Sequence, residues 1–427
     1  MSTPSPAHPP RRALDRWLAD GLQRVTGHAL GPYQSAVIRI GFAGTWLLFL
    51  LREVPHRREL YGPDGPWSWG MAQQLIAENS AFSGLMWSES TVWFEIVFAV
   101  AVLSSALLMV GWRTRTMSVL FMFGVLSLQN RSIFMGDGGD NVIHLMAIYL
   151  VLTRCGQVWS LDARRAARAA RAARATERAA SRESGAPVVR DRVGPVLWGV
   201  CGAVLFIGTV TDRVEIKTWL LLLFWGAWVA QWLWWTVGRR AAWRGHRALL
   251  DVLANLLHNA ALVVIMAEVC LIYATAGWYK IQGSRWQDGT ALYYPLKLDY
   301  FSPWPAFSGL FASSALLVMV LSYGTVIVQV AFPFTLFNRR VKNVLLVAMM
   351  LEHGGIAVLL GLPFFSLAMI AADAVFLPTV FLVWLGARVT GARDRLRARL
   401  PGRKRAPAGA PPAGRAQESP DPARTLV

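Results

Sequence analysis

Apolar residues along the chain gather into ten segments, and charged residues lie mostly between these segments. A helix needs about 20 consecutive apolar residues to cross the hydrocarbon core of a bilayer, and most of the segments approach that length. The pattern therefore predicts an all-α protein, a polytopic bundle of about ten membrane-spanning helices. The expected spans are residues 34–51, 92–111, 116–129, 139–153, 194–211, 218–237, 252–276, 312–335, 342–360 and 364–388.

The composition agrees with a membrane protein. Of the 427 residues, 55% are hydrophobic and 16% are charged, whereas soluble domains carry about 25% charged residues. The net charge of +18 would suggest a nucleic-acid partner in a soluble protein. Here the arginines lie between spans and in the tails, where they contact anionic lipid headgroups. We therefore expect the lipid bilayer of the plasma membrane as the partner, and no nucleic acid.

The charge of the loops predicts the orientation of the chain. Loops 112–116, 154–193, 238–247 and 338–342 are strongly basic, and they alternate with loops that carry fewer arginines. Basic loops stay on the cytoplasmic side of a membrane. Both chain ends are therefore expected in the cytoplasm, as in a multi-pass protein with an even number of spans.

Three regions follow from this organisation. Residues 1–30 form a cytoplasmic tail, in which segment 12–27 places its apolar residues on one helical face and so predicts a helix lying on the membrane. Residues 31–388 form the transmembrane domain. Its cytoplasmic linker, 155–193, repeats arginine every third or fourth residue and predicts a helix with one basic stripe. Residues 389–427 are rich in Pro, Ala and Arg and are expected to be disordered.

Ionisable residues inside spans are costly, and they usually face the interior of a bundle or a cavity. Arg39 lies early in the first span, where it either reaches the inner interface or pairs with a buried carboxylate. Glu352 and His353 lie near the middle of the ninth span, and two adjacent ionisable groups at that depth need partners. The chain has three cysteines, none in a CxxC pair, and no HExxH motif, so we expect no metal site.

A polar connection joins the two short spans at the predicted outer face. It combines several glycines with polar side chains, and the candidate site residues are Asn130, Arg131, Asp140, Asn141 and His144. One interpretation is a tight turn whose polar groups satisfy each other. The other is the polar wall of an outward cavity. The sequence leaves both open.

The segment 275–289 closes the seventh span and contains Lys280 among aromatic residues. One interpretation is structural: aromatic rings form an interfacial belt, and Lys280 extends to the headgroups. The other is catalytic, because a lysine shielded from water can lose its proton and act as a base. The residues concerned are Trp278, Tyr279, Lys280, Trp286 and Asp288.

This segment, AGWYKIQGSRWQDG, resembles the signature region of the vitamin K-dependent gamma-carboxylases and of their bacterial relatives, the horizontally transferred transmembrane (HTTM) domain proteins. Three weaker stretches fit the same family: VIRIGFAGTWLLF with Arg39, the outer loop with NR and GD, and EHGGIAVLLGLPFFSLAMI. The resemblance covers residues 30–388 in order.

The resemblance implies a function. In the carboxylases, the matching lysine deprotonates reduced vitamin K, and the later-helix histidine matches His353. It therefore implies Lys280 and His353 as catalytic residues, Trp278, Tyr279 and Trp286 as the lining of a quinol site, and a reduced quinone of the menaquinol type as cofactor. Arg39, the outer-loop set, Asp288 and Glu352 would complete a polar cavity. Asn141 and His144 are the nearest candidates for the family's helper Asn and His.

The chain departs from the carboxylases in two ways. After the last apolar segment the sequence continues with a short basic stretch, where we would expect the large substrate-holding segment of the carboxylases, and Tyr279 stands where carboxylases often have a second lysine. Short HTTM proteins resemble instead a bacterial protein needed to mature a secreted peptide toxin. The expected function is thus a carboxylase-like modification of a small secreted peptide or a membrane-soluble substrate. The alternative is a non-catalytic role in peptide maturation, immunity or transport.

Overall fold

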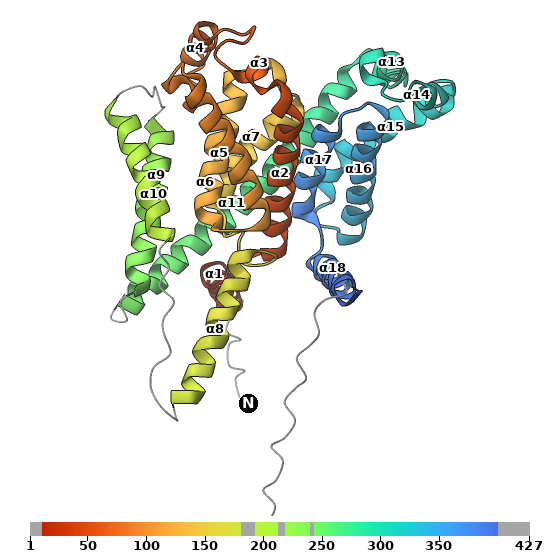
Figure 1. Cartoon of the computed structure of the whole chain (residues 1–427). Coiled ribbons are helices and arrows are strands. Elements are labelled where there is room, and N and C mark those ends of the chain that lie inside the picture. The colour runs from red at the N-terminus through yellow and green to blue at the C-terminus, as the bar shows by residue number, and fades with distance from the viewer. Residues whose placement is uncertain (1–10, 181–192, 212–217, 240–242, 400–427) are drawn as a thin grey trace, which may run out of the picture. The chain divides into compact units, whose positions relative to one another are not determined.

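The computed structural model describes residues 11–180, 193–211, 218–239 and 243–399, and within these ranges it contains helices and no strands (Figure 1). The expected all-α fold is confirmed. By its internal packing the chain divides into two units, residues 1–379 and 380–427. The longer helices are α1 (Arg11–Gly27), α2 (Pro32–Glu53), α5 (Thr91–Val110), α6 (Thr114–Arg131), α7 (Gly138–Leu152), α8 (Leu161–Ala180), α9 (Val193–Val210), α10 (Thr218–Arg239), α11 (Arg244–Gln282), α15 (Ala315–Ala331), α16 (Arg339–Leu359), α17 (Pro363–Asp373) and α18 (Thr379–Arg399).

Short helices connect them at the loops. The α-helical ones are α3 (Arg57–Tyr61), α4 (Trp69–Glu78), α12 (Ser284–Gln287), α13 (Tyr293–Lys297) and α14 (Pro305–Ala312). The 3₁₀ turns are η1 (Val54–His56), η2 (Gly84–Trp87), η3 (Ile133–Met135), η5 (Asp299–Phe301), η6 (Phe332–Thr335) and η7 (Ala374–Phe376).

Seven helices in the described part of the chain are long and apolar enough to cross a membrane, and an eighth span results if Pro363–Phe376 and Thr379–Leu396 count as one. This is the pattern of a multi-pass membrane protein. It is fewer than the ten spans expected, because segments 116–129 and 139–153 form helices α6 and α7 that do not meet the criterion for a span. The α7 helix has only 15 residues.

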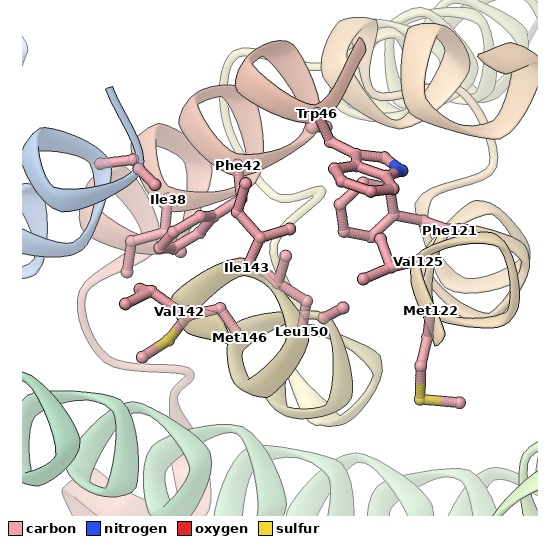
Figure 2. Packing of buried hydrophobic residues seen from close by; sticks show 14 of the residues in the cluster. Ile38, Phe42, Trp46, Phe121, Met122, Val125, Val142, Ile143, Met146 and Leu150 are labelled. Carbon is pink, nitrogen blue, oxygen red and sulfur yellow. The ribbon is translucent and has the colours of Figure 1, made fainter. Parts of the chain in front are cut away.

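The position of α6 and α7 explains why they differ from the other helices. Figure 2 shows Val142, Ile143, Met146 and Leu150 of α7 packed against Ile38, Phe42 and Trp46 of α2 and against Phe121, Met122 and Val125 of α6. Nearly all of these side chains are fully buried. The 18 residues of α6 are near the lower limit for a span, and the 15 residues of α7 fall below it. The two helices therefore form the packed centre of the bundle.

Loops that the charge pattern assigned to the cytoplasm meet at one end of this bundle. Asp162, at the start of α8, accepts hydrogen bonds from the backbone N–H groups of Arg113 (2.9 Å) and Thr114 (2.7 Å). These are the free N–H groups at the start of α6, which a carboxylate satisfies well. The bonds join loop 112–116 to the start of the basic linker. This contact agrees with the prediction that both segments lie on the same side of the membrane.

The expected surface helix and the expected basic helix both form. The α1 helix exposes Trp17, Leu18 and Leu22. The α8 helix carries arginines at positions 165, 168, 171 and 174; the stripe's last expected member, Arg182, lies outside the described residues. In the second unit α18 is helical through Arg399, within the segment expected to be disordered, and residues 400–427 lie outside the described part.

The α11 helix is longer than the span predicted for it, residues 252–276. Its 39 residues extend about 58 Å at 1.5 Å per residue. In its first half, Asn259 donates to the backbone carbonyls of Val25 and His28 (2.9 Å each), and Asn255 donates to that of Thr26 (2.9 Å). These side chains satisfy carbonyls that the end of α1 leaves free. The first half of α11 thus holds the end of α1, and the last turn of α11 carries Lys280.

Candidate functional site

Lys280 takes part in a polar chain that crosses three helices. Its Nζ atom donates to Oε1 of Gln329 on α15 (2.9 Å), and Nε2 of Gln329 donates to Oε1 of Glu352 on α16 (2.6 Å). Gln329 is buried, while Lys280 and Glu352 are half-buried. A single neutral amide thus separates the ammonium from the carboxylate. Their attraction is weaker than in a direct ion pair, because Coulomb energy falls with distance.

The aromatic residues around Lys280 divide into two groups. Trp286 on α12 lies beneath the ammonium, with Nζ 5.3 Å from its ring centroid. Trp278 and Tyr279 are 61% and 74% exposed. At about 100° per residue, Trp278 lies on nearly the opposite side of α11 from Lys280. The structure therefore brings Trp286 to Lys280, and it leaves the other two aromatic residues outside this site.

Asp288 has a structural task in the turn after α12. Its Oδ1 atom accepts hydrogen bonds from the backbone N–H of Thr290 (2.9 Å) and from the Thr290 hydroxyl (2.5 Å). The hydroxyl bond, with the backbone bond, lowers the pKa of Asp288 below its ordinary value. Gly289 follows with φ of 75°, a conformation that favours glycine. The W-x-D-G pattern thus forms a turn in which Asp288 is exposed and Gly289 is buried, and Asp288 lies outside the polar chain.

A second polar group is fully buried between α11, α16 and α17. The Tyr273 hydroxyl donates to Oδ1 of Asp373 (2.9 Å), and its oxygen lies 3.0 Å from Nε2 of His353. The exposed fractions of Tyr273, His353 and Asp373 are 1%, 2% and 0%. Nδ1 of His353, Oδ2 of Asp373 and the Ser366 hydroxyl are buried without a hydrogen-bond partner. We call Tyr273, His353 and Asp373 the buried triad.

The outer-loop residues form a tight polar turn, and several of them also line a cavity. Features of both structures that the sequence left open are therefore present. Asp137 and Asp140 form a capping box at the start of α7. The side chain of His144 bonds Oε1 of Gln129 through Nδ1 (3.0 Å). The cavity has a volume of about 380 Å³, and we call it the α7 cavity. Its walls include Trp46, Phe49, Tyr61, Gln129, Asn130, Asp137, Gly138, Asp140, Asn141 and His144.

Arg131, in contrast, has a structural role. Its side chain is 1% exposed and donates to the backbone carbonyls of Gly62 (2.7 Å) and Trp67 (2.9 Å). Asn130 donates to the carbonyl of Phe82 (2.7 Å). These bonds hold the long connection between α2 and α5 over the end of α6.

Arg39 differs from both sequence interpretations, since it neither reaches an interface nor bonds a carboxylate. It is fully buried and donates to the carbonyls of Leu108 (2.5 Å), Met109 (2.8 Å), Cys155 (3.2 Å) and Trp159 (2.9 Å). The first two are carbonyls of the last turn of α5, where the helix dipole favours a cation, and that of Leu108 also accepts from the Gly111 N–H (3.0 Å). Arg39 therefore closes α5 and fixes the connection between α7 and α8.

Phe365 lies between the α7 cavity and the buried triad. Its ring centroid is 5.5 Å from that of His353. On its other side it packs on the start of α7: a β-carbon added to Gly138 would lie 3.3 Å from the Phe365 ring, and one added to Gly139 would lie 2.6 Å from its Cα. Gly138 is part of the cavity wall. One aromatic ring thus separates the two polar regions.

Two site residues and one cavity have no counterpart in the sequence interpretation. Gln329 and Tyr273 connect the ionisable residues, and a neutral amide or phenol in an apolar span gives no charge signal. A larger cavity of about 760 Å³ is lined by parts of α4, η2 and the residues around them, with Trp69, Phe82, Trp87 and Glu89 in its wall. Its lining residues all come from the single stretch 69–89, where the sequence pattern gives no sign of a cavity.

The described residues contain no group of three or more His, Cys, Asp or Glu side chains placed to hold a metal ion. Comparison of the sequence with models of protein families and with curated proteins, and of the structure with solved structures, gives no significant match. The class that the fold defines is therefore a multi-pass α-helical membrane protein with buried polar groups.

Proposed function

We propose that the protein is a membrane enzyme in which Lys280 acts as a base on a membrane-soluble or small peptide substrate, related in chemistry to the vitamin K-dependent gamma-carboxylases. The observation that carries the proposal is the chain from Lys280 through Gln329 to Glu352. Polar chains of this kind are expensive within a bilayer and mark functional sites.

The contacts of Lys280 suit the task of a base. Its ammonium has a neutral acceptor, Gln329, as its nearest polar partner, and Glu352 stands behind that amide. A lysine with a direct carboxylate partner keeps its proton firmly. With an amide in between, Lys280 can release its proton and take one from a substrate, while Glu352 stabilises the charged form.

The residues present fit one part of a quinol site. A reduced quinone, when bound, would supply an acidic hydroxyl. Lys280 would take the proton of that hydroxyl at Nζ, and the Trp286 ring beneath it would orient a flat ring by stacking. Trp278 and Tyr279 do not belong to this set, because they are exposed away from Lys280. The proposed cofactor site therefore consists of Lys280 and Trp286.

A non-catalytic role in peptide maturation, immunity or transport is the second candidate. One observation favours it: the walls of the two cavities described above include neither Lys280 nor Trp286. Lys280 would then serve as a structural cation for Gln329. The two candidates differ in their response to Lys280→Arg. A structural cation tolerates the change, whereas a base does not, since arginine keeps its proton at all working pH values.

The test is mass spectrometry of the lipids that purify with the protein. Wild type, Lys280→Ala and Lys297→Ala are compared; Lys297 is an exposed lysine of α13 and serves as the matched control. We expect a menaquinone in wild type and Lys297→Ala, and its loss from Lys280→Ala. Equal amounts in all three variants would contradict a quinol site at Lys280. Absence from all three would favour the non-catalytic candidate.

A further inference from the structure

The buried triad has a fixed order of donors and acceptors. Because the single hydroxyl proton of Tyr273 is donated to Oδ1 of Asp373, the Tyr273 oxygen must accept from Nε2 of His353. The histidine is then the tautomer with its proton on Nε2, and Nδ1 is a free acceptor. Its lack of a partner agrees with this assignment. The triad thus runs His353 to Tyr273 to Asp373, with an open acceptor at its start.

Asp373 stands at the end of this chain with one hydrogen bond and no cation beside it. Among the described residues, the ionisable groups close enough to act electrostatically on the triad are Glu352 and Lys280, both half-buried on α16 and α11. On α2, which packs against α17, the contact is apolar: Gly41 lies against Ala371. A carboxylate at this depth without a counter-ion is costly in a membrane protein.

A path from outside leads to the open acceptor. The His353 ring contacts Phe365, and Phe365 contacts the start of α7 in the wall of the α7 cavity. The Ser366 hydroxyl, next to Phe365, is also buried without a partner. The Phe365 ring thus stands between the imidazole and Gly138, which is part of the cavity wall.

We propose that Tyr273, His353 and Asp373 form a proton-binding site that fills from the α7 cavity past Phe365. A hydronium ion in the cavity gives one proton to Nδ1 of His353 and becomes water. Nε2 of His353 passes its proton to the Tyr273 oxygen, and Tyr273 passes its own to Oδ1 of Asp373. The result is a neutral carboxylic acid, an unchanged phenol and a histidine protonated on Nδ1. One proton enters, and one buried negative charge disappears.

Lys280 lies close enough to act electrostatically on the triad, but it neither gives nor takes a proton in this transfer. The proton-binding site therefore stands even if the protein proves non-catalytic. The Lys280→Ala variant tests whether the carboxyl group is still protonated without the proposed base.

The experiment is infrared difference spectroscopy of the full-length protein in lipid nanodiscs after a drop in pH. We expect a carbonyl band from a newly protonated carboxyl group in wild type, in Lys280→Ala and in Glu352→Gln. The band is lost in Asp373→Asn. It forms more slowly in Tyr273→Phe, which breaks the relay but keeps the carboxyl group. A bulkier ring in Phe365→Trp delays it as well.

Two results would overturn the proposal. One is an unchanged band in Asp373→Asn, which would assign the proton to another carboxyl group. The other is an equal rate in wild type and Tyr273→Phe, which would exclude the relay. If Asp373→Asn does not fold, the Tyr273→Phe comparison decides alone, because this change removes only the hydroxyl group.

Discussion

The indole rings of Trp198 and Trp228 stack with their centroids 4.2 Å apart, and each donates its Nε1–H to the backbone carbonyl of the other (3.1 and 3.0 Å). This pair joins α9 to α10, which run side by side in Figure 1. Both helices are otherwise largely exposed and depend on few polar contacts.

The Trp198→Phe substitution tests the importance of this pair. It keeps a ring but removes one reciprocal hydrogen bond and part of the stacking, so we expect a loss of about 1–2 kcal/mol in stability. Thermal unfolding in detergent measures it. Trp219→Phe, at an exposed position of α10, is the control and should change little. Equal shifts in both variants would contradict the assigned role.

Arg39 is expected to be essential for folding. Arg39→Met keeps most of the apolar stem but removes the guanidinium donor from the carbonyls of Leu108, Met109, Cys155 and Trp159, of which Leu108 still accepts from the Gly111 N–H. Each unsatisfied group costs about 1–3 kcal/mol, so the yield of folded protein should fall severely. Size-exclusion chromatography of the purified protein measures this yield. The exposed Arg52 of the same helix gives the control, Arg52→Met, for which we expect normal yield.

Two glycines should respond oppositely to alanine. At Gly139 a β-carbon would lie 2.6 Å from Cα of Phe365, so Gly139→Ala must push α7 and α17 apart. At Gly354, within α16, a β-carbon meets nothing within 4 Å, and alanine favours the helix by up to about 1 kcal/mol. The midpoint of thermal unfolding should fall for Gly139→Ala and stay or rise for Gly354→Ala. A tolerated Gly139→Ala would contradict the close contact at Phe365.

The thiol of Cys155 should be inert in the folded protein. Burial raises the pKa of Cys155 above its ordinary value of 9.0, although the nearby Arg39 opposes the shift. Only the thiolate reacts with maleimides, so we expect slow labelling at neutral pH and fast labelling after unfolding. Mass spectrometry locates the modified cysteine.

The same pKa shift gives a dependence of stability on pH. A raised pKa in the folded state means that the unfolded thiol loses its proton first as the pH rises. Its stabilising contribution is therefore complete below the ordinary pKa and is lost at more alkaline pH. Cys155→Ala should lose less stability than wild type between neutral pH and about pH 10. Identical losses in the two proteins would contradict the shift.

The sequence predicts the helices well because apolar runs and basic loops are local signals. It counts α6 and α7 among the spans, whereas the seven or eight span-like helices of the described residues do not include them, because a short apolar run cannot show whether lipid or protein surrounds it. Phe42 and Ile143 meet in the core through contacts distant in sequence.

The candidate site is only partly accessible to sequence reasoning. The position of Trp278 opposite Lys280 follows from helical periodicity alone and could have been predicted. The carbonyl partners of Arg39 could not, because they lie in two other segments, the end of α5 and the connection between α7 and α8, that only the fold brings together. Gln329 could not be predicted either, because its role depends on hydrogen bonds to Lys280 and Glu352, which lie on other helices.

Because α11 is one continuous helix, it fixes both the distance and the rotation between the residues that hold α1 and Lys280. From His258, which bonds the carbonyl of Leu30, to Lys280 is about six turns of helix, so both residues share nearly one face. A single residue inserted between them would rotate Lys280 by about 100° away from Gln329 while α1 stayed in place. The number of residues between His258 and Lys280 is therefore constrained by the direction in which Lys280 must point. Insertions or deletions in this stretch should be tolerated only when they add or remove nearly whole helical turns.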